Sequence, residues 1–256
     1  MSPDPAWAVE IQRLSKTFGG TVAVDGIDLA VPRGTFYGLL GPNGAGKSTT
    51  LAMATGLLRP DAGMVRVSGI DVWMDPVAIK ARIGVVPESL LLFERLSGLE
   101  LLDYVGRLRG LPADVVAERS ADLLKVLGLA ADGHKLVVDY SQGMRKKVSL
   151  AAALLHTPEV LFLDEPFEAV DPVSVRTIRS VLDRFVSSGA TIVFSSHVMA
   201  TVEALCDHVA IMHEGSVVRT GSTADVMGDG SLDDAFADAV GAGVDDLVDL
   251  DWLRAT

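Results

Sequence analysis

One stretch carries the strongest structural signal in this sequence of 256 residues: Gly41-Pro42-Asn43-Gly44-Ala45-Gly46-Lys47-Ser48. It fits the pattern GxxxxGK[ST], in which a glycine-rich backbone cradles a chain of phosphates. The pattern is meaningful only between a strand and a helix, and both are predicted here. Residues 34–40 are apolar and aromatic, as in a buried strand, and residues 49–57 are apolar and alanine-rich, as in a helix. The sequence therefore predicts a phosphate loop.

The residue types in this loop indicate how it would bind a nucleoside triphosphate. Glycines allow backbone N–H groups to converge on phosphate oxygens, and the start of the helix adds positive potential. We expect Lys47 to reach the β- and γ-phosphates and the Ser48 hydroxyl to ligate Mg²⁺. Thr49 is expected to contact the α-phosphate.

A pair of carboxylates follows an apolar run later in the chain. Residues 160–163 read Val-Leu-Phe-Leu, as in a central strand of a parallel sheet. Asp164 then falls at the carboxyl end of that strand, where open α/β sheets bind ligands, and it is predicted to hold Mg²⁺. Glu165 is placed to act as the general base that polarises water. Without the phosphate loop, a charged strand end before a turn would be the simpler interpretation.

Three further elements fit a phosphate site but also have ordinary structural explanations. Ser141 and Gly143 precede a helix-like stretch and form either an anion site or a plain serine cap. His197 ends a second apolar strand and either contacts the γ-phosphate or caps the strand. Asp171 follows the carboxylate pair and either belongs to the site or only starts the next helix.

In their order, these motifs resemble those of the nucleotide-binding subunit of an ABC transporter, over residues 9–221. The resemblance assigns Phe18 to stacking on adenine, Gly41 to Thr49 to the phosphate loop, Glu88 to the Q-loop position, Ser141 and Gly143 to the signature motif, Asp164 and Glu165 to the Walker B motif, Asp171 to the D-loop and His197 to the switch histidine. An aromatic face suits a base, although Phe18 taken alone could equally belong to the core.

Two departures from the family pattern concern the nucleotide site. The Q-loop usually carries Gln, and Glu88 stands there instead. A glutamate can still ligate Mg²⁺, but it adds negative charge near the γ-phosphate. The signature usually reads Leu-Ser-Gly-Gly-Gln, whereas residues 140–144 read Tyr-Ser-Gln-Gly-Met, and Met144 cannot replace the polar contacts of Gln. Together these departures resemble a bacterial branch that serves exporters whose membrane subunit is a separate chain.

The resemblance implies an α/β fold: a P-loop NTPase (RecA-like) core with a parallel sheet, an antiparallel β subdomain and an inserted α-helical subdomain. We expect one ATPase domain over residues 1–227. Its core would comprise residues 1–89 and 158–227, and the helical subdomain residues 90–157.

Local patterns agree with this division of the chain. Residues 9–31 alternate polar and apolar, which predicts antiparallel strands with turns at Gly19-Gly20 and at Gly26. Ser97 with Glu100 forms a capping box that opens a helix. Residues 90–93 are apolar in a presumed loop, and we expect them either to line the groove for a membrane partner or to be buried within the chain.

Residues 228–256 differ in composition from the rest of the chain. They hold eight Asp and a single Arg, with no Glu or Lys. Leu232, Phe236 and Val240 are spaced like one face of a short helix, and Leu247, Leu250 and Leu253 recur further on. This acidic tail is either disordered or packed on the core or on a partner.

The amino-acid composition limits which classes of partner and which cellular location are expected. Lys and Arg number 22 against 34 Asp and Glu, a net charge of −12, so nucleic acid is not an expected partner. No apolar run approaches the roughly 20 residues of a spanning helix, and residues 1–7 do not read as a secretory signal. Cys206 alone cannot form an internal disulfide. These features predict a cytoplasmic protein, and the resemblance places it on the inner face of the plasma membrane.

By resemblance, the function is ATP hydrolysis that drives a separate membrane permease, with export favoured and ATP and Mg²⁺ required. Two cassettes, identical or different, would close head to tail, so that Ser141 and Gly143 of one reach the γ-phosphate held by the other. The alternatives are an importer ATPase, which would share every catalytic residue, and a soluble ABC ATPase of translation or repair. Residues Glu165 and His197 with the signature disfavour an unrelated P-loop kinase or GTPase.

Overall fold

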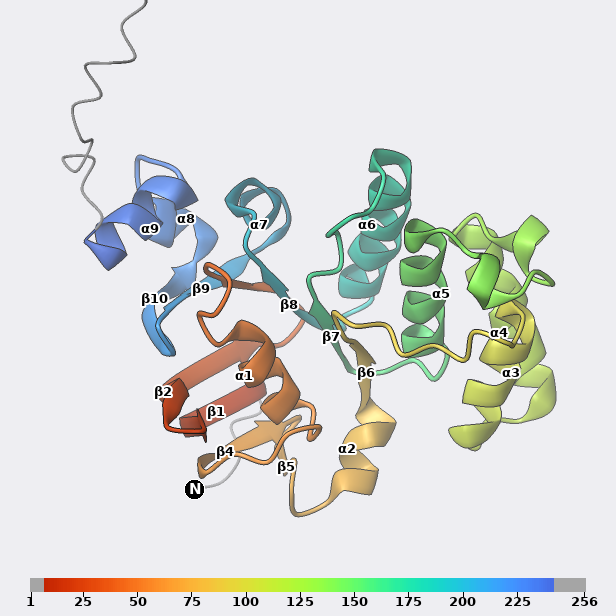
Figure 1. Cartoon of the computed structure of the whole chain (residues 1–256), viewed down its shortest axis with the longest axis horizontal. Coiled ribbons are helices and arrows are strands. Elements are labelled where there is room, and N and C mark those ends of the chain that lie inside the picture. Colours follow the sequence, from red (N-terminus) through yellow and green to blue (C-terminus); the bar gives the residue numbers. More distant parts are fainter. Residues whose placement is uncertain (1–6, 242–256) are drawn as a thin grey trace, which may run out of the picture.

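A six-stranded sheet forms the centre of the computed structural model, which describes residues 7–241 (Figure 1). Its strand order is β10-β9-β3-β8-β7-β6, and all neighbours pair in parallel except β10, which is antiparallel to β9. The strands are β3 (Phe36–Leu40), β6 (Ile83–Val86), β7 (Val160–Asp164), β8 (Thr191–Ser196), β9 (His208–His213) and β10 (Ser216–Ser222). The predicted α/β class with a parallel sheet is confirmed.

A second, antiparallel sheet of order β2-β1-β4-β5 covers part of the first. Its strands are β1 (Trp7–Phe18), β2 (Thr21–Pro32), β4 (Ala62–Val67) and β5 (Ile70–Asp71). The predicted turn at Gly26 is wrong. Gly26 lies inside β2 with φ +58°, where the register shifts between the pairs Leu14–Ile27 and Lys16–Val24. Such a β-bulge takes a residue in the left-handed region without ending the strand.

The helices gather mainly in two groups (Figure 1). One group lies at the end of the molecule beyond β6 and β7 and contains α3 (Gly98–Leu108), α4 (Ala113–Val126) and α5 (Gln142–Leu154), with the 3₁₀ turns η1 (Ala130–Asp132) and η2 (Val137–Asp139). The other group contains α7 (Met199–Leu205), α8 (Thr223–Met227) and α9 (Leu232–Val240), while α1 (Lys47–Ala54), α2 (Pro76–Arg82) and α6 (Pro172–Ser187) pack along the sheets. Within the described residues, none of these helices is both long and apolar enough to cross a membrane.

Apolar residues fill the space on both faces of the parallel sheet, as the continuous apolar runs predict. Successive residues of β7 point to opposite sides, so Leu161 and Leu163 join the cluster under α5 and α6, whereas Val160 and Phe162 join the cluster toward α1 and the antiparallel sheet. A strand that is packed on both faces has little freedom to move, so functional groups at its carboxyl end are held in fixed positions.

The capping box at the start of α3 is present as predicted. Ser97 Oγ accepts from the Glu100 amide at 3.2 Å, and the Glu100 carboxylate accepts from the Ser97 amide at 2.8 Å. Both groups satisfy N–H donors that the first turn of a helix leaves without intrahelical acceptors.

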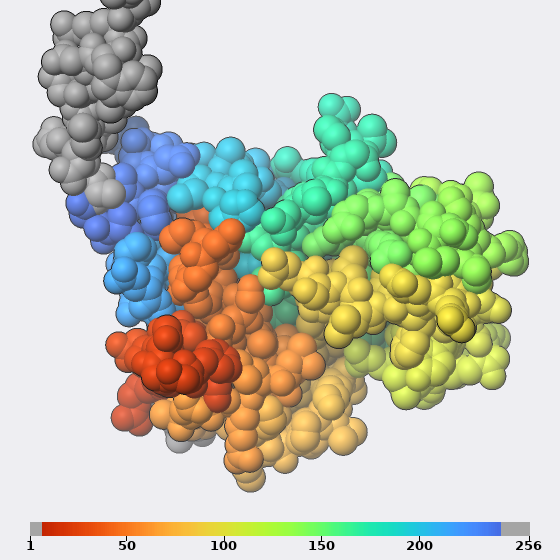
Figure 2. All heavy atoms as spheres, viewed as in Figure 1, coloured from red at the N-terminus to blue at the C-terminus, as the bar shows by residue number. Residues whose placement is uncertain are grey.

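Residues 90–93 alternate between burial within the chain, which was one of the two expectations, and exposure. The side chains of Leu90 and Leu92 pack against the core, but Leu91 and Phe93 are exposed. The rings of Phe93 and Tyr104 meet edge to face, with their centroids 5.0 Å apart. A surface hollow of about 740 Å³ is lined by residues 90–96 and Tyr104. The connection from β6 to α3 that contains it crosses the front of the molecule in Figure 2, where it is yellow.

The first part of the acidic tail packs on the core. Helix α9 forms over Leu232–Val240, as its spacing predicts, and contacts α7, α8 and β10. Leu232 and Ala235 are buried, and Phe236 is half-buried beside them. Packing is therefore the outcome for residues 228–241, while Leu247, Leu250 and Leu253 lie outside the described residues.

The burial of Leu232 makes α9 part of the domain's stability. We predict that Leu232→Ala lowers the free energy of unfolding by about 2–5 kcal/mol, because it removes methyl groups from a filled core position and leaves a cavity. Urea unfolding followed by circular dichroism measures the change. Asp238→Ala, on the exposed face of the same helix, should change it by no more than about 0.5 kcal/mol. Equal values for the two variants would contradict the packing of α9.

Candidate functional site

The carboxyl ends of three neighbouring strands lie level with one another. In the parallel register, Leu40 of β3 pairs with Ser196 of β8, and Ser195 pairs with Asp164 of β7. The chain beyond these residues therefore leaves the sheet at one edge. This edge is where open α/β sheets bind ligands, and it receives the phosphate loop, Glu165 and His197.

The phosphate loop leads into α1, which begins at Lys47, two residues before the predicted start. Gly46 precedes the helix with φ +101°, and a Cβ atom there would lie 2.4 Å from the carbonyl oxygen of Ala23. Only glycine fits this position. Since Gly46 has no side chain to cap the helix, the amides of the first turn remain available to an anion.

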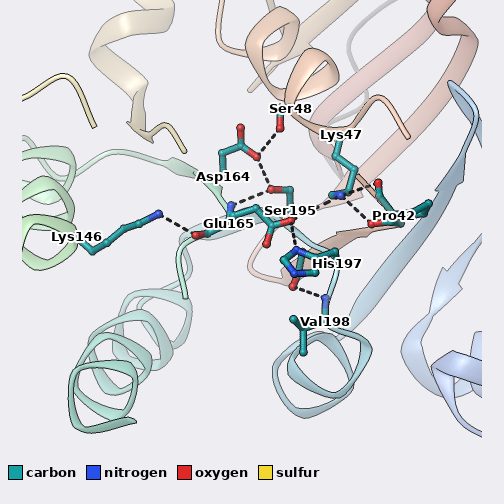
Figure 3. Close-up of polar contacts among 11 residues, drawn as sticks. Pro42, Lys47, Ser48, Lys146, Asp164, Glu165, Ser195, His197 and Val198 are labelled. Carbon is teal, nitrogen blue, oxygen red and sulfur yellow. Dashed lines mark hydrogen bonds and ion pairs between the residues drawn. The ribbon is translucent and has the colours of Figure 1, made fainter. Parts of the chain in front are cut away.

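The Lys47 side chain is buried and points back into the loop (Figure 3). Its Nζ donates to the carbonyl oxygens of Gly41 at 2.7 Å and Pro42 at 3.1 Å and lies 3.7 Å from Glu165 Oε1. Burial lowers the pKa of Lys47, and the nearby Glu165 and Asp164 carboxylates oppose that effect. The ammonium is thus already surrounded by oxygen acceptors.

Asp164 connects the phosphate loop to the neighbouring strand. Its Oδ1 accepts from Ser48 Oγ at 3.0 Å and from Ser195 Oγ at 2.5 Å. A hydroxyl and a carboxylate side by side are hard oxygen donors that suit Mg²⁺. The described residues contain no group of three or more His, Cys, Asp or Glu placed to hold a metal ion. The two oxygens of Ser48 and Asp164 suit an ion such as Mg²⁺, which also takes ligands from water and phosphate.

Glu165 and His197 form a hydrogen-bonded pair. His197 Nδ1 lies 3.0 Å from Glu165 Oε1, and because a carboxylate only accepts, Nδ1–H is the donor. Glu165 is buried and adopts φ +45°, an unusual backbone conformation for a residue with a side chain. In Figure 3 its side chain points toward both Lys47 and His197.

A cleft of about 360 Å³ opens beside the phosphate loop and Glu165. Phe18 and Glu88 line it together with Asn43, Gly44, Gly46, Lys47, Ser48, Thr49 and Glu165. The Phe18 ring is 48% exposed rather than part of the core, with Lys16 Nζ 5.5 Å from its centroid. The structure thus brings the candidate aromatic and the Q-loop glutamate to the phosphate loop.

Ser141, Gly143 and Asp171 lie together at a different place, and among the described residues they are not part of the cleft lining. Ser141 caps α5 by accepting from the Met144 amide at 3.2 Å. A Cβ atom on Gly143 would lie 3.0 Å from Asp171 Oδ2, so these two residues are neighbours. Hydrogen bonds from Ser174 hold the pKa of Asp171 below its usual range as it caps α6.

Sequence reasoning missed two residues that contact the carboxylate pair. Ser195 is fully buried, and its Oγ both donates to Asp164 and accepts from the Glu165 amide at 3.0 Å. Its signal in the sequence was a serine in the apolar run of β8. Lys146 is also buried, and its Nζ donates to the Glu165 carbonyl oxygen at 2.9 Å. The run Arg145-Lys146-Lys147 gives no sign of this, since charged residues on a helix are normally exposed.

The two hydrogen bonds of Ser195 give a stability prediction. Ser195→Ala leaves the buried Glu165 amide without this acceptor, and we expect the free energy of unfolding to fall by about 1–3 kcal/mol. Urea unfolding measures the loss. Ser187→Ala, on an exposed face of α6, is the matched control and should unfold like the parent protein. An unchanged midpoint for Ser195→Ala would show that the buried amide finds another partner.

Comparisons with known proteins agree with one another. The sequence profile described as ABC transporter matches residues 24–168. The daunorubicin/doxorubicin resistance ATP-binding protein DrrA of Streptomyces peucetius is 40% identical over 88% of this chain and 68% of its own length. The bacitracin transport ATP-binding protein BcrA of Enterococcus faecalis is 38% identical over 83% and 68%. A solved ATP-binding subunit of an ABC transporter superposes with a TM-score of 0.85 at 28% identity, covering 91% of this chain and 99% of that one.

Proposed function

Because this chain belongs to the ABC transporter family as an ATP-binding subunit, we propose that it hydrolyses ATP to drive export through a separate membrane permease. Two of its relatives are named for resistance to, or transport of, antibiotics. A third, LnrL of Bacillus subtilis, is named for linearmycin resistance and is 34% identical over 85% of this chain. These names favour export over import and over a soluble role in translation or repair.

One observation carries the catalytic part of the proposal. The phosphate loop and the two strand ends form a single linked network, in which Lys47 and His197 meet at Glu165 and Ser48 meets Asp164. Such a network holds a triphosphate beside a carboxylate that can take a proton from water. Phe18 would stack on adenine, and residues Gly41 to Thr49 would bind the phosphates.

Mg²⁺ is proposed as the cofactor, held by Ser48 and Asp164, with Glu88 as a further ligand at the edge of the cleft. When bound, the ion neutralises charge on the phosphates. The protein itself contributes the fixed position of the oxygen donors. Ser195 Oγ donates a hydrogen bond to Asp164 and so helps to fix the position of that carboxylate.

Glu165 is proposed to accept the proton of the attacking water. Its carboxylate is buried between a lysine and a histidine, and both partners restrict its orientation. The Nδ1–H of His197 occupies Oε1, which fixes the direction of the other oxygen. His197 is further proposed to contact the γ-phosphate. General-base catalysis depends on such placement as well as on basicity.

A second cassette, of the same or a different chain, is proposed to complete the site. Ser141 is exposed at the start of α5, away from the cleft of its own chain. In a head-to-tail pair, Ser141 and the Gly143 backbone would bind the γ-phosphate of the partner, with Asp171 beside them. A ligand shifts an equilibrium only by binding one state more tightly, and the γ-phosphate would do so by bridging the closed pair.

The surface hollow beside residues 90–96 is proposed to dock the permease at the cytoplasmic face of the membrane. Leu91 is 93% exposed and Phe93 is 55% exposed. Large apolar side chains gathered on a surface indicate a contact with another protein. The hollow belongs to the segment that leads directly from Glu88 to α3, so docking and the nucleotide cleft share one connection.

Removing the proposed base tests the catalytic assignment. Glu165→Gln should lower the ATP turnover number by about 10²–10⁴-fold, because the amide cannot accept a proton. The variant should still bind ATP and accumulate an ATP-dependent dimer in size-exclusion chromatography. Glu118→Gln, the same change at an exposed position on α4, should hydrolyse ATP at close to the parent rate. Near-normal phosphate release by Glu165→Gln would refute the assignment.

The unusual glutamate of the Q-loop gives a separate prediction. If Glu88 ligates Mg²⁺ through one oxygen, the amide oxygen in Glu88→Gln can take its place, and turnover should stay within about tenfold of the parent. Mg²⁺ titration of ATPase activity should then show a higher half-saturating concentration. Glu118→Gln on the exposed face of α4 controls for the charge change. Complete loss of turnover in Glu88→Gln would instead show that an acid is required.

A further inference from the structure

Lys146 makes a direct contact between α5 and the carboxylate strand. It is 3% exposed, and its Nζ donates to the backbone carbonyl oxygen of Glu165 at 2.9 Å. Figure 3 shows the side chain extended from α5 toward the turn that follows β7. A lysine is rarely buried to this extent without a defined partner, and here the partner is the main chain of the proposed base.

The backbone of Glu165 is held on both sides. Ser195 Oγ accepts from its amide at 3.0 Å, and its carbonyl oxygen accepts from Lys146 and from the Glu168 amide at 3.3 Å. Between them, the residue keeps φ +45°, a conformation that is unfavourable for a residue with a side chain. The two side-chain hydrogen bonds help to hold a conformation that the residue would not adopt alone, and that conformation directs the carboxylate toward Lys47 and His197.

The surroundings of Lys146 are acidic. Burial lowers its pKa, while the carboxylates of Glu168, Asp164, Glu88 and Glu165, in that order, act in the opposite direction. A buried ammonium beside several carboxylates is compensated in charge. Lys146 therefore donates a hydrogen bond to the turn and also places a positive charge close to several carboxylates.

Of the two side chains that hold the Glu165 backbone, Lys146 comes from α5, whose N-cap is Ser141. Ser141 caps α5, and Lys146 follows little more than one turn later. The helix is stiff over that distance, so a displacement of its first turn moves the Lys146 backbone too. Ser195, by contrast, belongs to the central sheet and stays with Asp164.

We propose that Lys146 is a positioning residue that couples the placement of α5 to the orientation of the Glu165 carboxylate. The inference rests on the proposed function, since it takes Glu165 to be the base and Ser141 to meet the partner's nucleotide. Engagement of Ser141 then acts on the base through one helix and one hydrogen bond, and the site is fully ordered only when α5 is in place.

The test is the steady-state kinetics of Lys146→Met in the full chain. This variant keeps a long side chain but has no donor. We expect the turnover number to fall by about 10- to 100-fold, as for a misplaced catalytic group, while the KM for ATP changes by less than about threefold. Lys146→Arg, which retains a charged donor, should recover most of the lost turnover. A turnover number for Lys146→Met within about twofold of the parent would overturn the proposal.

Two double variants separate positioning from a general structural role. In a Glu165→Gln background, Lys146→Met should cause no further loss, because the group that it orients is already gone. An equal loss in both backgrounds would mean that Lys146 acts elsewhere and would overturn the proposal. If Lys146→Met alone does not fold, Glu88→Gln/Lys146→Met removes one charge of each sign and is compared with Glu88→Gln. Equal turnover numbers for Glu88→Gln/Lys146→Met and for Glu88→Gln would also overturn the proposal.

The same data distinguish failure of the inference from failure of the proposed function. If Glu165→Gln is slow and Lys146→Met is normal, the base assignment stands and the coupling is wrong. If Glu165→Gln turns over normally, the base assignment is wrong and the coupling fails with it.

Discussion

The parallel hydrogen-bond ladder of β3, β8 and β7 fixes the site. It places Leu40 level with Ser196 and Asp164 level with Ser195, so three turns that are distant in sequence leave the sheet at one height. A shift of one residue in β7 would reverse the faces of its apolar side chains and expose part of the core. The packing that stabilises the domain thus also sets the distances among Lys47, Glu165 and His197.

Charge compensation is the second requirement at this edge. Two adjacent carboxylates at a strand end, with Glu88 close by, would repel one another in the absence of cations. Two buried lysines compensate this negative charge. Lys47 lies beside the Glu165 carboxylate, and Lys146 donates to the backbone carbonyl oxygen of Glu165. The negative charge of Glu88 is therefore near two lysine ammonium groups of the protein itself, even when no metal ion is bound.

The helical region contributes to the chemistry through one helix. Helix α5 presents Ser141 at its exposed start, brings Gly143 against Asp171 and places Lys146 on the carboxylate turn. The segment of residues 87–97 connects the cleft to the surface hollow in a similar way. Both connections run between the proposed nucleotide cleft and surfaces proposed to meet other chains, as a subunit that converts hydrolysis into movement requires.

Sequence alone established the elements whose chemistry lies in neighbouring residues. The phosphate loop before α1, the carboxylates after β7, the capping box of α3 and the amphipathic α9 follow from spacing and residue type, because glycine conformations, caps and periodicity are local properties. It misplaced the turn at Gly26, since a bulge and a turn both favour glycine. The roles of Ser195 and Lys146, the exposure of Phe18 and the docking of α9 came only from the tertiary structure, because each depends on contacts between segments far apart in the chain.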